Sequence, residues 1–89
     1  MSSYKRAKLP PTFQWQERAL ETVLRCQDKE VLRVVPLNRG WLVEVLVLDS
    51  AGNRPTFIPT SKEAGTWWGA RWAKDRIEHL ESITRLAVQ

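Results

Sequence analysis

The sequence predicts a small α+β domain with the element order α-β-β-β-α, in which a three-stranded antiparallel meander is packed by two helices. Three observations lead to this prediction. A segment with helical periodicity comes first. Two runs rich in β-branched residues and a third run flanked by prolines come next, and a capped helix start then precedes three of the five tryptophans. A chain of 89 residues suits one domain, which we expect to span residues 12–89.

Residues 1–11 are predicted to form a disordered basic tail. Lys5, Arg6 and Lys8 precede the pair Pro10-Pro11, and little apolar surface is available to order the stretch. The whole chain has 14 basic and 10 acidic side chains. Without these three cations the remainder of the chain has 11 basic and 10 acidic side chains and is nearly neutral. A dedicated DNA-binding fold concentrates its positive charge on the folded body. This distribution therefore favours only weak, non-specific contact with nucleic acid.

The first helix is predicted over residues 12–27, with Thr12 as its N-cap. On a helical projection Phe13, Leu20, Val23 and Leu24 share one face, while charged residues occupy the remainder. This pattern is typical of an amphipathic helix packed on a sheet.

The meander is predicted from the strands 31–37, 41–49 and 54–60, joined by turns at 38–40 and 49–53. The prolines of the last run suit an edge strand, because proline lacks a ladder donor. Both faces of the middle strand are largely apolar, which is typical of a strand covered on both sides. We expect either one helix on each face, or both helices on one face and a second copy of the chain on the other.

The second helix is predicted to begin at Thr60, with Glu63 completing a capping box. Two faces could meet the sheet. The favoured face contains small residues that allow a close approach: Gly65, Gly69, Trp72, Ala73, Ile77, Leu80 and Ile83. The alternative face contains Ala64, Trp68 and Trp72. Residues 83–88 either extend the helix or form a short fourth strand.

No enzyme chemistry is predicted. His79 and Cys26 are the single histidine and the single cysteine, and they lie on different predicted helices. The sequence has no metal-ligand spacing and no glycine-rich phosphate loop, so we expect no cofactor and no small-molecule substrate. The lone cysteine suits a reducing compartment, and Pro36, Asn38 and Gly40 interrupt the longest apolar run. We therefore expect a cytoplasmic protein without a membrane anchor or secretory signal.

The predicted interaction surface is on the second helix, where Trp67 and Trp68 lie beside Arg71 and Lys74. Tryptophan and arginine are enriched at interface hot spots, which indicates a protein partner or a second copy of the chain. The alternative function is an accessory protein that binds nucleic acid, with contacts from Lys5, Arg6, Lys8 and Lys62 and stacking by the tryptophans. A third interpretation places the tryptophans in the core.

Three resemblances accompany these patterns. Residues 40–45, 52–54 and 57–68 together resemble the arm-type DNA-binding domain of phage integrases, which implies a three-stranded sheet that reads DNA with a helix behind it. The order of helix, three strands, Ser61-Lys62-Glu63-Ala64 and helix resembles a double-stranded RNA-binding domain, which implies RNA contact through Lys62. The chain is also similar to small bacterial proteins of unknown function that have a hairpin followed by a helix.

Overall fold

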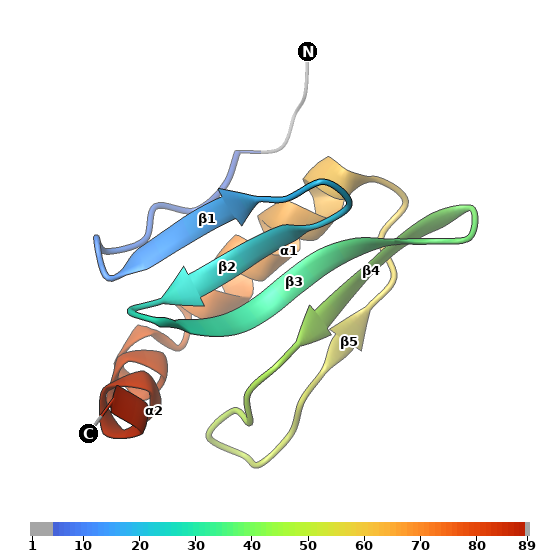
Figure 1. Cartoon of the computed structure of the whole chain (residues 1–89). Helices are drawn as coiled ribbons and strands as arrows, with labels where there is room; N and C mark the ends of the chain where they lie inside the picture. Colours follow the sequence, from blue (N-terminus) through green and yellow to red (C-terminus); the bar gives the residue numbers. More distant parts are fainter. Residues whose placement is uncertain (1–4, 89) are drawn as a thin grey trace.

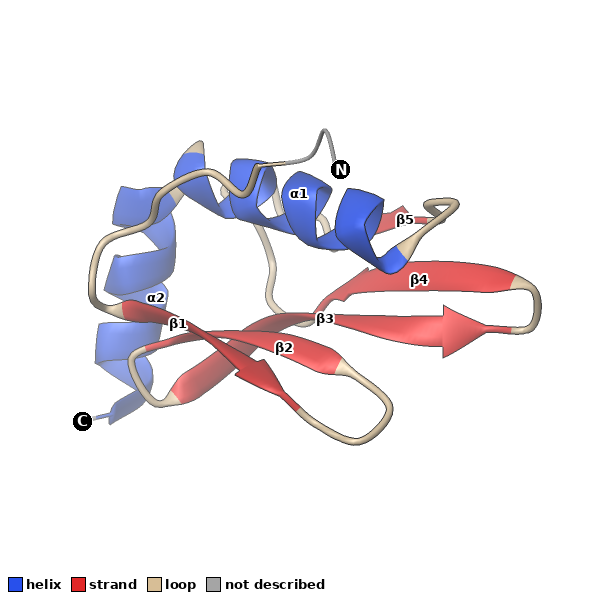
Figure 2. Cartoon of the chain, turned by 90° about the horizontal axis from the view of Figure 1, so that it is seen from above, coloured by secondary structure: helices blue, strands red, loops and turns tan. Residues whose placement is uncertain are grey.

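The computed structural model describes the backbone of residues 5–88 and the side chains as far as residue 85. One five-stranded antiparallel sheet follows the order of the chain, and two helices come after it (Figure 1). The elements are β1 Phe13–Glu17, β2 Thr22–Cys26, β3 Lys29–Leu37, β4 Gly40–Val45, β5 Thr56–Phe57, α1 Lys62–Lys74 and α2 Ile77–Val88. Both helices lie on the same face of the sheet (Figure 2). Neither helix, over the residues described, has the length and apolar character needed to cross a bilayer.

The α+β class is confirmed, but the predicted helix over 12–27 is wrong, because these residues form the hairpin of β1 and β2. Apolar and polar residues alternate along β1, which is the period of a strand, and Phe13 pairs with Cys26 across the hairpin. Leu20, assigned to the apolar helical face, is 77% exposed at the turn. The turn lacks glycine, proline and asparagine, so the usual sequence signal of a hairpin is missing. The strands therefore precede both helices.

The remaining strands lie near their predicted positions. β3 and β4 are joined at the predicted turn, where Asn38 has a φ of 49°. In the next turn the backbone N–H groups of Ala51 and Asn53 each donate to Asp49 Oδ1 at 2.9 Å. β5 has only two residues instead of the seven expected over 54–60, because Pro55 and Pro59 limit the ladder on either side.

The helical region differs from the prediction at both ends. The N-cap is Ser61 and not Thr60, since Ser61 Oγ accepts from the backbone N–H of Ala64 at 3.1 Å. The helix ends at Asp75, whose N–H bonds to the Arg71 carbonyl, and a second helix then begins. Because α2 extends through residue 88, a strand at 83–88 is excluded.

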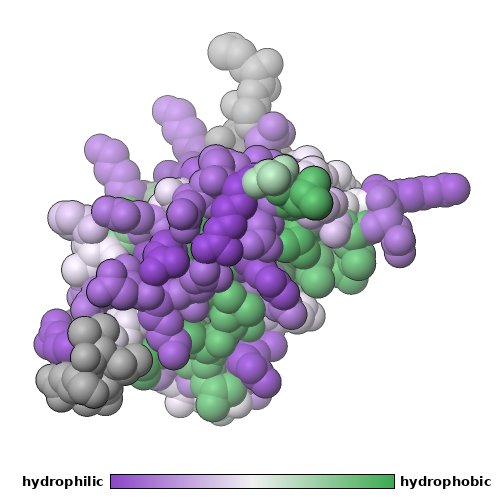
Figure 3. Space-filling view, in the orientation of Figure 1, coloured by the Kyte–Doolittle hydropathy of each residue, from purple (hydrophilic) through white to green (hydrophobic). Residues whose placement is uncertain are grey.

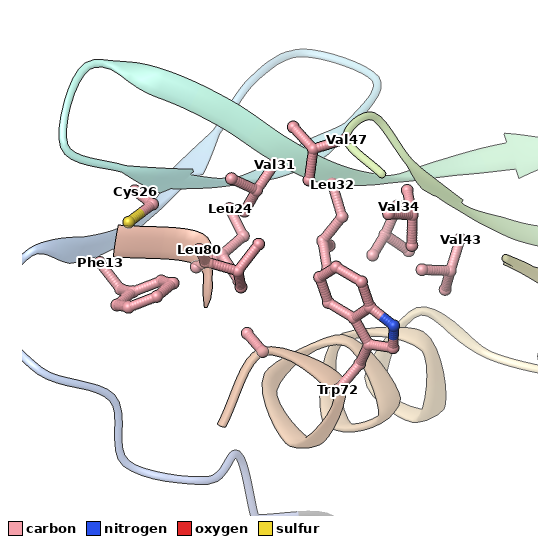
Figure 4. Packing of buried hydrophobic residues seen from close by; sticks show 12 residues of the cluster. Phe13, Leu24, Cys26, Val31, Leu32, Val34, Val43, Val47, Trp72 and Leu80 are labelled. Carbon is pink, nitrogen blue, oxygen red and sulfur yellow. The ribbon is translucent and has the colours of Figure 1, made fainter. Parts of the chain in front are cut away.

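The core lies between the sheet and the two helices. It contains side chains from β1–β4, the segment after β4 and both helices: Phe13, Leu24, Cys26, Val31, Leu32, Val34, Val43, Val45, Val47, Trp72, Ala73 and Leu80 (Figure 4). Leu9 packs against the margin of this core, and residues 1–4 of the predicted tail lie outside the described residues.

Gly65 and Gly69 face the sheet, so the favoured orientation of the helix is confirmed. A Cβ added to Gly65 would lie 2.9 Å from Val34 Cγ1 and 3.2 Å from Val43 Cγ2. At Gly69 the added atom would lie 3.1 Å from Leu32 Cδ1. Such distances are shorter than ordinary carbon–carbon contacts of about 3.5–4.0 Å. The helix backbone approaches the sheet this closely because these two positions lack side chains.

The opposite face of the sheet bears no helix, and charged side chains pair across it beside the half-buried Val35 and Leu42. Arg33 bonds to Glu44 at 2.7 Å and Arg18 bonds to Glu30 at 2.6 Å. Val23 belongs to this face by its pairing with Arg33, and yet its exposed fraction is 0%. Long arginine and glutamate side chains can cover apolar surface with their aliphatic stems. Hydrophilic residues accordingly gather across the middle of this face, with apolar residues at its margins (Figure 3).

Replacing Gly69 with valine should destabilise the domain by about 1–3 kcal/mol, the usual range for overpacking a filled site. The matched control is Lys74→Val, which places the same β-branched residue at an exposed position of α1 and should cost less than about 1 kcal/mol. Urea unfolding of the two variants measures the difference. Equal costs would mean that Gly69 does not contact the sheet.

Candidate interaction surface

The two adjacent tryptophans of α1 point away from the glycine face. Trp67 is 39% exposed. Trp68 is half-buried because it packs against the margin of the core and its ring stacks on Phe57 of β5, with the ring centroids 5.3 Å apart and the planes inclined by 20°. The interpretation that places the tryptophans in the core is right for Trp72, holds in part for Trp68, which packs against the margin of the core, and is wrong for Trp67.

A shallow groove of about 290 Å³ runs along this side of α1. We call it the tryptophan groove, and its lining residues are Trp67, Trp68, Arg71, Trp72, Asp75 and Arg76. Three of the four predicted surface residues line it. The fourth, Lys74, lines a neighbouring depression that shares Asp75 and Arg76 with the groove. The sequence analysis missed Arg76, although its spacing of four residues from Trp72 on a helical pattern would have indicated a contact.

Two arginines are held at the groove in different ways. The Arg76 guanidinium lies over the Trp72 ring, 5.0 Å from its centroid, and Nη1 donates to the Trp72 carbonyl at 3.0 Å. Arg71 Nε lies 3.8 Å from Asp75 Oδ2, and these side chains are 65% and 58% exposed. An exposed ion pair of this kind contributes about 0–1 kcal/mol. Arg76 is thus fixed by the fold, while Arg71 is held weakly.

Apolar residues of β5 extend the exposed surface beside the groove. Phe57 is partly exposed next to Trp68, and the following Ile58 is 66% exposed. Pro55 and Pro59 flank these residues, and prolines at an edge strand hinder the addition of another strand. A partner at this surface would therefore contact side chains instead of continuing the sheet.

The predicted nucleic-acid contacts lie away from the groove lining. Lys62 Nζ donates to Glu17 Oε2 at 2.8 Å. Arg6 lies over the Trp15 ring at 4.7 Å and reaches the Glu17 carboxylate at 4.0 Å. Lys5 and Lys8 are exposed in the segment that precedes β1. The structure thus brings Lys62 and Arg6 together on a single carboxylate, which offsets part of their charge.

The sheet face opposite the helices is also balanced in charge. Arg18, Arg25 and Arg33 of this face are each paired with a glutamate, at distances between 2.6 and 3.8 Å. The hydrogen bonds that Arg33 and Arg18 donate to Glu44 and Glu30, respectively, raise the pKa of both arginines, so both guanidinium groups stay protonated. Pairing of this kind differs from the unpaired cations with which proteins bind phosphates.

The single histidine and cysteine contact different groups. His79 Nε2 lies 2.9 Å from the Leu48 carbonyl oxygen, a contact that joins α2 to the loop after β4. Cys26 is buried, and its Sγ lies 3.4 Å from Thr84 Oγ1. Burial raises the pKa of the Cys26 thiol, which disfavours the reactive thiolate. Among the residues described, no group of three or more histidine, cysteine or acidic side chains could hold a metal ion.

Comparison of the chain with protein-family models, with curated proteins and with solved structures finds no match. The assignment of a function therefore depends on the surface itself.

The contact between Lys62 and Glu17 gives a testable pH dependence. The hydrogen bond from Lys62 lowers the pKa of Glu17, and a second hydrogen bond from Thr22 adds to the effect. A lowered pKa in the folded state stabilises the fold above the ordinary glutamate pKa of about 4.3. This contribution is lost as the pH falls through the lower, folded-state pKa.

We expect Lys62→Ala to raise the pKa of Glu17 in an NMR titration of its side-chain carboxyl, and Lys74→Ala to leave it unchanged. The difference in unfolding free energy between the wild type and Glu17→Gln should also shrink as the pH is lowered below about 4. An unchanged Glu17 pKa in Lys62→Ala would mean that Lys62 is not held by this carboxylate and is available to another ligand.

Proposed function

We propose that the protein is a small non-enzymatic binding module that holds a protein partner on the tryptophan groove and the adjoining residues of β5. The observation that carries the proposal is the contiguity of the exposed apolar residues. Phe57 of β5 stacks on Trp68 of α1, and Trp68 lines the tryptophan groove together with the exposed Trp67. Single exposed apolar residues are common on soluble proteins, whereas contiguous patches mark interaction sites.

The chemistry of this surface also supports a protein partner. Tryptophan and arginine are the residue types most enriched at interface hot spots, and the tryptophan groove is lined by both. Trp72 and Arg76 supply a packed floor, so binding would need little ordering of the module itself. The buried thiol of Cys26 is compatible with a reducing compartment, and we expect the module to act in the cytoplasm.

Peptides selected from a random display library on the wild-type protein provide a test. Replacing Trp67 with alanine should weaken the selected peptides by about 30-fold or more, because loss of a hot-spot tryptophan costs about 2 kcal/mol or more. The control is Leu20→Ala, which removes another exposed apolar side chain, far along the chain in the β1–β2 turn, and should leave affinity unchanged.

Circular dichroism melts establish that both variants remain folded. If the selected peptides bind Trp67→Ala as tightly as they bind the wild type, the tryptophan groove is not the binding surface and the proposal fails.

A further inference from the structure

We infer that the tryptophan groove binds an acidic peptide segment that inserts one aromatic or aliphatic side chain and places carboxylates beside it. This inference rests on the proposed function and specifies the kind of partner. It follows from the charges at the groove and from the ring faces that are already covered.

The groove is cationic. Arg71 and Arg76 line it together with one acid, Asp75, while Lys74 and Glu78 of the adjoining depression offset each other. A partner with carboxylates beside its apolar anchor would complement this surface, since charge complementarity sets both specificity and association rate.

The geometry of Arg76 suits a carboxylate. Its stacking on Trp72 and its hydrogen bond to the Trp72 carbonyl fix the guanidinium before any partner arrives. A guanidinium carries five N–H donors in a planar fork, more than this single hydrogen bond uses. The fork can therefore accept a carboxylate in the two-bond arrangement that makes arginine–carboxylate pairs strong.

Arg71 provides a second cation that can change partners. Its contact with Asp75 is long, at 3.8 Å, and both side chains are largely exposed. A carboxylate delivered by a peptide can replace Asp75 at little cost, because the existing pair contributes about 0–1 kcal/mol.

The same observations disfavour a second copy and a nucleic acid as the occupant. A second copy would bring an identical cationic rim against the first. A nucleic acid needs open ring faces on which bases can stack. One face of Trp68 is covered by Phe57, and Trp72 is buried with Arg76 over its ring, so Trp67 is the largely exposed ring among the three tryptophans of the groove.

The test uses the selected peptides described above, together with the wild-type protein and three charge variants. We expect the peptides that depend on Trp67 to be enriched in aspartate and glutamate around an apolar anchor. Changing these acids to their amides should weaken binding by about 10-fold or more, the effect of losing a hydrogen bond between charged groups. Binding should also weaken as the salt concentration rises.

Arg71→Gln and Arg76→Gln should each weaken the acidic peptides and leave their amide forms nearly unchanged. The matched control is Arg39→Gln, which removes an exposed arginine in the β3–β4 turn. This change should alter neither the affinity for the acidic peptides nor the affinity for their amide forms. Asp75→Asn should bind the acidic peptides at least as tightly as the wild type, because it removes the competing carboxylate.

Each remaining outcome overturns the inference in a recognisable way. Neutral or basic peptides that still depend on Trp67 would refute the acidic partner and leave the proposed function intact. Sedimentation equilibrium that shows a dimer dependent on Trp67 would identify a second copy as the occupant. A single-stranded oligonucleotide that displaces the peptides would identify nucleic acid. Selected peptides whose affinity is unchanged by Trp67→Ala would refute the proposed function itself.

Discussion

The close approach of α1 to the sheet at Gly65 and Gly69 is the constraint on which the rest of the structure depends. A Cβ atom at either position would press on β3 or β4, so only a glycine face allows the helix to lie this near. Once this face is turned inward, the positions of all other side chains on the helix are set by its period of 3.6 residues. Trp72 then enters the core, Trp68 packs against its margin and on Phe57, and Trp67 is left exposed on the outer flank. The packing of the core and the exposure of the candidate surface therefore have one cause.

The domain places both helices on one face of the sheet and covers the other with its own ion pairs. A chain of this size buries only about 60% of its unfolded surface, so it has few apolar side chains to spare for a second core. The arginines and glutamates over Val23 achieve coverage without another layer of structure. Phe57 and Trp67 of the aromatic cluster at β5 and α1 are 36% and 39% exposed, whereas Val23 is fully buried, and this contrast separates the two surfaces. It is the reason for placing the partner at the tryptophan groove instead of on the sheet.

The parts of the fold that could be predicted from the sequence are those where a residue type or spacing is typical of one local structure. Asn38 marks a turn because asparagine tolerates a positive φ, and Asp49 marks a turn because its carboxylate accepts hydrogen bonds from the backbone N–H groups that follow it. The spacing of the glycines in α1 correctly predicted which face of the helix meets the sheet. The hairpin of β1 and β2 could not be predicted in this way, since its turn around Leu20 lacks every usual turn residue. The apolar residues of this hairpin also fall on one side of a helical projection, and this pattern led to the wrong prediction of a helix. The groove was predicted in part: its tryptophans and Arg71 were identified, whereas Arg76 was not, although its four-residue spacing from Trp72 is that of a helical contact.

The central claim is that the glycine face of α1 contacts the sheet and turns the adjacent tryptophans outward. The most direct measurement is a set of nuclear Overhauser effects between the Gly65 Hα protons and side-chain methyl groups. The structure predicts strong effects to the methyl groups of Val34 and Val43, with no ring-current shift of these methyls from Trp67. The contradictory result is an absence of glycine–methyl effects together with large upfield shifts of the Val34 methyls caused by Trp67. That outcome would place the aromatic face of the helix against the sheet and remove the candidate surface.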